Sequence, residues 1–130
     1  MQNSRSSWSF DHSSASSVVE HALGVVALSR PLVEAVQRKD RDLASWFFNH
    51  SSASQLRRAI SSIALNLSEG FGAGAGNARL RFETALGSLN EAKTAIRVAI
   101  AWGYFSEQSA ATVLESLRVL GGRVVGLVRR

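Results

Sequence analysis

Apolar residues recur at helical spacing in four stretches of this chain, and short polar or glycine-rich segments separate the stretches. In the second stretch the clearest apolar stripe advances by steps of 4, 3 and 4 residues: Leu56, Ile60, Ile63, Leu67. The fourth stretch has the same spacing: Val113, Leu117, Leu120, Val124, Leu127. The pattern predicts helices at about 18–39, 52–69, 78–102 and 107–128, with no useful length of strand alternation. We therefore expect an all-α fold, and the short connections favour an antiparallel up-down four-helix bundle.

The third stretch combines a stripe of large residues with a regular series of alanines. Its large residues are Phe82, Leu86, Leu89, Ile96 and Ile100. Lys93 occupies the seam position that lacks an apolar residue. Alanine recurs every seven residues beside this stripe, at Ala78, Ala85, Ala92 and Ala99. Small residues at this repeat allow a neighbouring helix to approach closely.

The expected helix boundaries follow from capping residues. Capping boxes at Ser17–Glu20 and Ser52–Gln55 predict two helix starts, and three further residues are expected to cap helices: Gly70, Asn77, Ser106. The first stretch is apolar almost all round, which favours burial on several sides. Pro31 lies inside it and predicts a kink or a break near Ser29. Gly121–Gly122 indicates close packing or fraying in the fourth helix.

Outside the helices, a ten-residue motif occurs twice. SWSFDHSSAS at 7–16 recurs as SWFFNHSSAS at 45–54 with eight identical positions. The first copy lies in an expected polar tail at 1–16, before a bundle at 17–130, and the second forms an inserted aromatic and serine-rich loop. Its aromatic residues Trp46, Phe47 and Phe48 are a candidate oligomer interface, because exposed aromatic clusters favour contact with another subunit. The alternative is a duplication that a tail and a loop tolerate.

Two segments carry a resemblance to a known family. QLRRA at 55–59, with Asn66 and Glu69-Gly70, precedes Phe82 and the A-x-GSL-x-E pattern at 85–91, which contains Gly87 and Glu91. A W-G-Y at 102–104 matches the family's L-G-Y. These residues resemble the 23S rRNA intervening-sequence proteins, a four-helix-bundle family that includes the accessory variability determinant of diversity-generating retroelements. The segment 46–54 departs from the family pattern as an insertion before the QLRRA motif.

The resemblance implies a bundle that assembles into a ring of five subunits and has no enzymatic activity. The retroelement members are basic and bind nucleic acid and a reverse transcriptase, which makes RNA or DNA and a reverse transcriptase the implied partners. The motif positions Asn66, Glu69, Gly70, Phe82, Gly87 and Glu91 are interpreted as structural. Glu69 is expected to pair with Arg58 or another arginine across the bundle, and Asn66 to be a buried polar residue that sets helix register.

Composition narrows the class of protein further. The chain has 130 residues with 45% hydrophobic content, which predicts one globular domain. It contains no cysteine, which excludes disulfides and thiolate metal sites and fits a cytoplasmic protein. No apolar run is long enough for a membrane span, and residues 1–14 do not resemble a secretory signal.

Catalytic chemistry has no candidate constellation in the sequence. The histidines are His12, His21 and His50, and neither a histidine pair nor an E-x-x-H motif is present to bind a metal. The glycine-rich segment 70–76 lacks the Lys-Ser/Thr of a phosphate-binding loop and follows a helix. We expect no enzyme activity, no metal and no cofactor.

The positive charge is unevenly placed and suggests a polyanion. Residues 1–54 hold five basic and five acidic residues, whereas residues 55–130 hold ten basic and five acidic ones, so the whole net charge of +5 lies there. Thirteen of the fifteen cations are arginine, whose planar fork suits phosphate. The candidate nucleic-acid-binding residues are Arg57, Arg58, Arg79, Arg81, Lys93, Arg97 and Arg123.

Two functions stay open at this point. The first is an oligomeric adaptor that contacts nucleic-acid phosphates without reading sequence. The second is a homo-oligomeric protein-interaction module whose arginines form an ordinary solvated surface.

Overall fold

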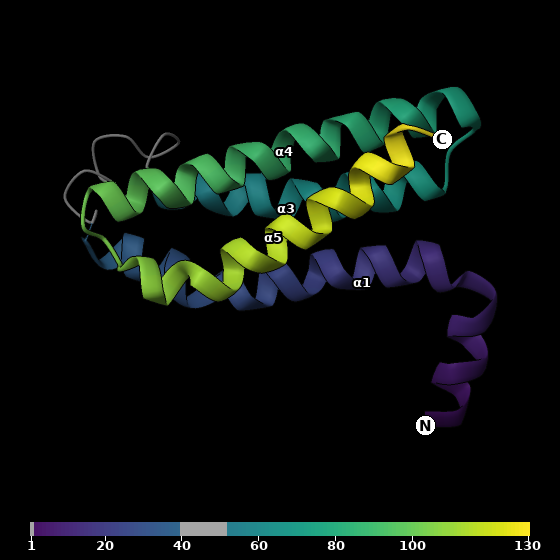
Figure 1. Ribbon diagram of the computed structural model, residues 1–130, viewed down its shortest axis with the longest axis horizontal. Helices are drawn as coiled ribbons and strands as arrows, with labels where there is room; N and C mark the ends of the chain where they lie inside the picture. The colour runs from purple at the N-terminus through teal and green to yellow at the C-terminus, as the bar shows by residue number, and fades with distance from the viewer. Residues whose placement is uncertain (1, 40–51) are drawn as a thin grey trace.

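The computed structural model describes residues 2–39 and 52–130, and all regular structure within these ranges is helical. The helices are α1 (Gln2–Lys39), α3 (Ser52–Phe71), α4 (Ala75–Ala101) and α5 (Glu107–Val128). Successive helices run in opposite directions, as Figure 1 shows. The predicted all-α class with four helices is therefore confirmed for the described part of the chain.

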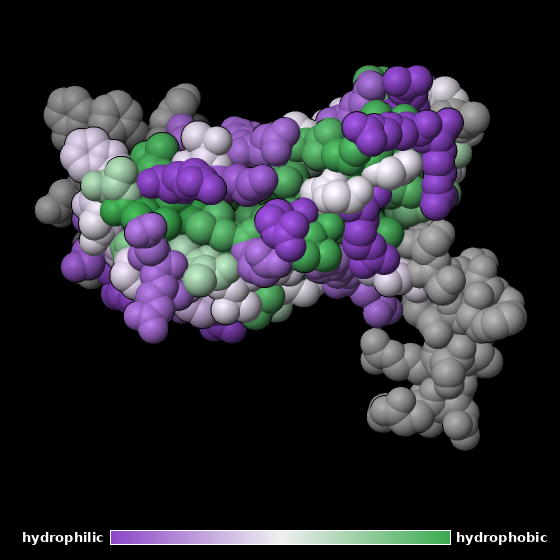
Figure 2. Space-filling view, in the orientation of Figure 1, coloured by the Kyte–Doolittle hydropathy of each residue, from purple (hydrophilic) through white to green (hydrophobic). Residues whose placement is uncertain are grey.

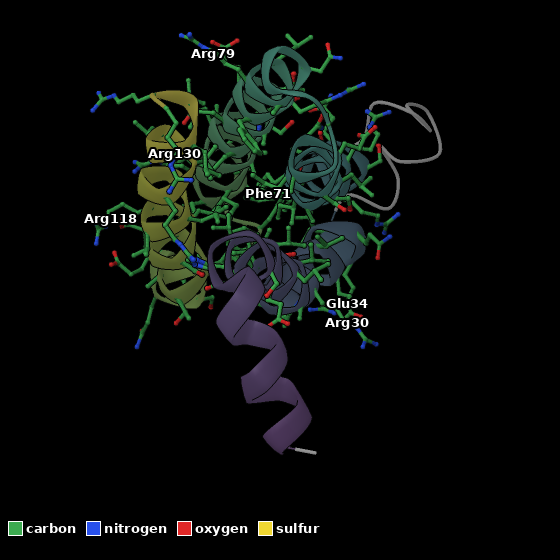
Figure 3. The ribbon with its side chains drawn as sticks, turned by 90° about the vertical axis from the view of Figure 1, so that its right-hand side faces the viewer. Arg30, Glu34, Phe71, Arg79, Arg118 and Arg130 are labelled. Carbon is green, nitrogen blue, oxygen red and sulfur yellow. The ribbon has the colours of Figure 1, made fainter. Side chains whose placement is uncertain are left out.

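The four helices form a closed square in cross-section. α3 and α4 share the most extensive contact, α1 packs against α3, and α5 packs against both α4 and α1. Viewed along the bundle, α4 and α1 occupy opposite corners, as do α3 and α5 (Figure 3). Each helix therefore has one outer side between two grooves. The structure holds a single chain, so assembly into a ring stays a prediction.

The core contains the predicted stripes of α3 and α5 and part of the predicted stripe of α4, where Ala78, Leu86 and Ile100 are only half-buried. Residues of α3 and α5 that recur at steps of 3 and 4 are buried: Leu56, Ile60, Ile63, Leu67, Val113, Leu117, Leu120, Val124, Leu127. In α4 the alanines Ala85, Ala92 and Ala99 are buried together with Phe82, Leu89 and Ile96. Burial of these apolar side chains is the dominant force that holds the helices together.

Helix α1 differs from its prediction at three points. It begins at Gln2, earlier than the expected start at Val18, and it continues through Pro31 without a break. Ser17 therefore lies inside the helix and does not cap it. Its outer side also stays partly exposed, because Leu23 is 54% and Leu28 is 44% exposed. The expectation of burial on several sides is wrong, since within the described ranges α1 packs mainly against α3 and α5.

The other helix ends show which capping residues were predicted correctly. The Ser106 hydroxyl accepts a 3.0 Å hydrogen bond from the Ser109 amide and caps α5, as expected. Asn77 does not cap α4, because α4 begins at Ala75 after Gly74, which makes no side-chain cap. For Ser52, the remaining expected start residue, the side chain lies outside the described part of the structure. The loop residues Trp46, Phe47 and Phe48 also lie outside it.

Gly70 serves packing between helices and does not end α3. The helix continues to Phe71, and no positive φ occurs at Gly70. A Cβ placed on Gly70 would lie 2.4 Å from Cε1 of the Phe82 ring, which is too close for any real contact. The Phe82 ring also packs against Phe71, with 5.0 Å between ring centroids. Because Gly70 has no side chain, the Phe82 ring of α4 can pack directly against the backbone of α3.

Gly121 has a milder version of this role in α5. It is buried, and a Cβ at this position would lie 3.4 Å from a methyl group of Leu89. Of the two interpretations of Gly121–Gly122, close packing is confirmed at Gly121. Gly122 is exposed and has open space around it.

No helix among the described residues combines the length and the apolar character needed to cross a membrane.

Candidate anion-binding groove between α4 and α5

A shallow groove of about 270 Å³ lies between α4 and α5, and three cations line it. Lys93 and Arg97 are one helical turn apart on α4, and Arg118 reaches the groove from α5. Ala111 and Leu114 form the apolar part of its lining. Figure 2 shows this side of the molecule, with hydrophilic side chains lying over apolar surface between α4 and α5. We name the groove by these residues, with Glu115, as the α4–α5 groove.

One carboxylate partly neutralises the groove. Arg118 donates hydrogen bonds of 3.0 and 2.7 Å to the two carboxylate oxygens of Glu115. These bonds lower the pKa of Glu115 and raise the pKa of Arg118, so both groups stay charged near neutral pH. Among the described residues, neither Lys93 nor Arg97 forms an ion pair. With three cations and one anion, the groove keeps a net charge of +2.

The structure separates the other predicted nucleic-acid contacts. Arg57 lines a different groove between α1 and α3, and Arg58 is exposed on α3. Arg79 pairs with Glu83 at 3.5 Å, and Arg81 approaches Glu69 at 3.9 Å. Since α3 and α4 are antiparallel, the cations at their starts lie at opposite ends, as the sequence predicts. Figure 3 shows Arg79 on the outer side of α4, toward α5.

Arg123, the last predicted contact, joins two helices instead. Its guanidinium donates a 2.8 Å hydrogen bond to the Ser17 hydroxyl and one of 3.5 Å to the Ser17 carbonyl. It also lies 3.2 Å from Nδ1 of His21, whose Nε2 is 3.1 Å from the Ser116 hydroxyl. A neutral imidazole fits this arrangement, with Nδ1 accepting from Arg123 and Nε2–H donating to Ser116. The cluster fastens the end of α5 to α1.

The stability of this cluster should depend on pH. Burial, and next the charge of Arg123, lower the pKa of His21 below its ordinary value of 6.5. The unfolded chain therefore binds a proton at His21 more readily than the folded chain does. We expect the free energy of unfolding to be highest above pH 6.5 and to fall as the pH decreases through that value.

This dependence is measured by urea unfolding of the parent protein and of the His21→Gln variant between pH 8 and pH 5. The variant should lose less stability on acidification than the parent protein, and the two histidines that remain in both proteins cancel in the comparison. If the free energy of unfolding changed equally with pH in the two proteins, His21 would not be the source of the pH dependence.

The motif residues form a polar connection between α3 and α4. Asn66 is 8% exposed, and its amide donates 2.9 Å hydrogen bonds to the carbonyl and the hydroxyl of Ser62. The Ser62 hydroxyl in turn lies 2.7 Å from that of Ser88. Buried polar groups need such partners. Both partners of Asn66 lie on α3, and the Ser62–Ser88 contact is the one that reaches α4. The prediction that Asn66 is buried is confirmed.

The two motif carboxylates differ in their surroundings. Glu69 approaches Arg81, which is one of the cross-bundle arginines that the sequence left open. Glu91 is exposed and lines a hollow with Asn90 and Thr94. Within the described ranges no group of three metal-ligating side chains is present. These residues thus bind helices to each other and present polar groups to solvent.

Sequence reasoning missed four participants in these clusters: Arg118, Ser62, Ser88 and Ser116. Arg118 lies four residues after Leu114 and three after Glu115, so helical spacing places these three on one side of α5. That this side faces α4 becomes clear only from the packing of the bundle. The serine contact could not be found this way, because it depends on the register between two helices.

Comparison with known proteins places the chain in a family. No curated protein matches the sequence. A solved structure from Bacteroides thetaiotaomicron, described as a protein of unknown function from the S23 ribosomal protein family, shares the fold with a TM-score of 0.75. The similarity covers 87% of this chain and 99% of that one at 14% sequence identity. The family model of the 23S rRNA-intervening sequence protein matches residues 21–126. Since this match covers well over half of the chain, the chain belongs to the family of 23S rRNA-intervening sequence proteins.

Proposed function

We propose that this protein is a non-enzymatic adaptor that binds the phosphates of a nucleic acid in the α4–α5 groove. The observation that carries the proposal is the convergence of Lys93, Arg97 and Arg118 on one surface, with Lys93 and Arg97 in no ion pair among the described residues. Unpaired cations on one side of a rigid bundle attract a polyanion and release its counterions on binding.

The lining of the groove favours sequence-tolerant binding. It contains no aromatic residue on which a base could stack, and its volume of about 270 Å³ suits phosphate groups better than a flipped base. Arg97 and Arg118 can each donate two parallel hydrogen bonds to one phosphate. Affinity should therefore depend strongly on salt and weakly on sequence.

Self-association would strengthen such binding. Each groove offers few contacts, so a single copy should bind weakly, whereas several linked grooves gain avidity on one nucleic acid. A reverse transcriptase stays a predicted partner from the resemblance alone, and co-purification with the polymerase encoded nearest this gene would test it.

The experiment is a salt titration of binding to a fluorescent structured RNA and to a DNA duplex. In the triple variant Lys93→Gln, Arg97→Gln, Arg118→Gln we expect at least a tenfold loss of affinity at low salt, with the slope of log K against log salt reduced by about 2 to 3. The matched control carries Arg30→Gln, Arg38→Gln and Arg57→Gln. This control also loses three positive charges, but from exposed residues on α1 and α3.

The control separates a local site from general attraction. It should keep most of the affinity and most of the salt slope. Equal losses in both triple variants would mean that only net charge matters, and absence of binding by the parent protein at low salt would refute the proposal.

A second function, a homo-oligomeric protein-interaction module, is favoured by exposed apolar side chains away from the groove. Leu80 and Val98 of α4 are 58% and 43% exposed, and Leu65 of α3 is 63% exposed. This surface and the groove are separate, so both functions are compatible in one molecule.

A further inference from the structure

The groove between α1 and α3 that contains Arg57 differs in character from the α4–α5 groove. It has a volume of about 480 Å³, and its inner lining is formed by Val33 and Ile60, which are buried in the core. Half-buried Val26 continues this apolar surface along α1. Grooves of this size between the helices of a bundle, mostly apolar with a few polar groups, are typical binding sites for small molecules. We call it the α1–α3 groove and define it by Val26, Val33, Gln37, Arg57, Ile60, Ser61.

The α1–α3 groove carries one positive charge that the chain does not neutralise. Two of its charged lining residues, Arg30 and Glu34, form a 3.0 Å ion pair with each other. Figure 3 shows this pair on the outer side of α1, pointing away from the core. Arg57 forms no ion pair or hydrogen bond among the described residues. The groove therefore has one guanidinium available for one negatively charged group.

The polar groups of the groove gather toward one end of it. α1 ends at Lys39 and α3 begins at Ser52, and the two helices are antiparallel (Figure 1). Gln37 and Arg57 are therefore near the same end of the bundle, whereas Val26 lies about 16 Å from Gln37 along α1, at a rise of 1.5 Å per residue. Ser61 follows Arg57 by one helical turn on the same side of α3. The groove is thus elongated, with a charged end and an apolar end.

We propose that the α1–α3 groove binds a small amphipathic carboxylate of the fatty-acid class. The carboxylate accepts two parallel hydrogen bonds from the Arg57 guanidinium, and the Ser61 hydroxyl and the Gln37 amide are further donors beside it. The acyl chain lies along Val33, Ile60 and Val26, where its burial supplies most of the affinity.

The charge and shape of the groove select this class of ligand. A polyanion fits the α4–α5 groove, which has three cations and a net charge of +2, but the α1–α3 groove has one unpaired cation above apolar side chains. A single charged group at one end of an extended apolar chain matches that distribution. This inference goes beyond the proposed function and does not depend on nucleic-acid binding.

The test is calorimetric titration with octanoate, and with n-octanol as its uncharged analogue. Arg57→Gln should weaken octanoate binding about tenfold or more, because it removes a hydrogen-bonded charge, and should leave octanol binding unchanged. Arg38→Gln is the matched control, since Arg38 is also an exposed arginine at this end of the bundle but does not line the groove. It should bind octanoate like the parent protein. Equal losses in the two variants, or no loss in Arg57→Gln, would overturn the placement of the carboxylate.

The apolar part of the groove is tested by chain length and by a blocking side chain. From hexanoate to decanoate, each added methylene should tighten binding by up to about fourfold. Ala27→Trp places a bulky ring at an exposed lining position and should weaken octanoate and octanol binding alike. Leu28→Trp, at a 44% exposed residue of α1 outside the groove, should bind both as the parent does. Affinity that does not change with chain length, or equal effects of the two tryptophans in proteins of unchanged helicity, would overturn the proposal.

RNA binding by the same proteins keeps this inference separate from the proposed function. Arg57→Gln should bind RNA as the parent protein does. A parent protein that binds RNA but not octanoate would overturn this inference alone, whereas one that binds octanoate but not RNA would overturn the proposed function alone.

Discussion

Gly70→Ala is expected to destabilise the protein by about 1–3 kcal/mol, the usual cost of overpacking a filled core. The new Cβ would lie 2.4 Å from the Phe82 ring. Phe82 is 7% exposed and packs against Phe71, so its ring cannot swing into solvent without losing these contacts. The ring or the backbone of α3 must therefore shift. The free energy of unfolding in urea measures the loss.

Gly122→Ala is the control for this prediction, because both changes replace a helical glycine with alanine. In an open position the change should stabilise the helix by up to about 1 kcal/mol. The difference between the two variants isolates the clash with Phe82. In a Phe82→Leu background the cost of Gly70→Ala should shrink, since the smaller side chain frees the space. Equal effects of alanine at positions 70 and 122 would show that Gly70 has no packing role.

Leu67→Ala should cost about 2–5 kcal/mol, a large part of the stability of a domain of this size. Leu67 is fully buried, at 0% exposure, where α3 faces the core. Truncation removes its favourable burial and leaves a cavity that surrounding side chains fill only partly. Thermal and urea unfolding should both report the loss, with the native helicity kept at low temperature.

The matched change for Leu67→Ala is Leu23→Ala, which removes the same atoms from a side chain that is 54% exposed. The free energy of unfolding of this variant should differ from that of the parent protein by no more than about 0.5 kcal/mol. Similar losses at both positions would contradict the placement of Leu67 in the core and of Leu23 on the outer side of α1.

The core was predictable because helical periodicity reports directly which side of each helix avoids water. Leu56, Ile60 and Ile63 illustrate this, as do the buried alanines of α4 at positions 85, 92 and 99. Helix starts were predicted less well, since several residues near a start can cap it. Ser106 caps α5 as expected, whereas Gly74 precedes α4 in place of Asn77.

The candidate site was only partly predictable, because it depends on which helices become neighbours. Lys93 and Arg97 share a face by spacing alone, but Arg118 joins them only once α5 packs beside α4. Arg123 shows the opposite case. Its charge suggested a nucleic-acid contact, yet in the structure its guanidinium contacts the side chains of Ser17 and His21 on α1. Gly70 was expected as a helix end, and its true role depends on a ring from the next helix.

The short turn between α3 and α4 has a consequence for how the chain reaches this fold. Only residues 72–74 separate the two helices, which share the most extensive contact and the hydrogen bonds of Ser62 with Asn66 and Ser88. Contacts between segments so close in sequence cost little loop-closure entropy and form early. We therefore infer that the α3–α4 hairpin is the folding nucleus. In this order of folding, α1 and α5 pack against the hairpin after it has formed.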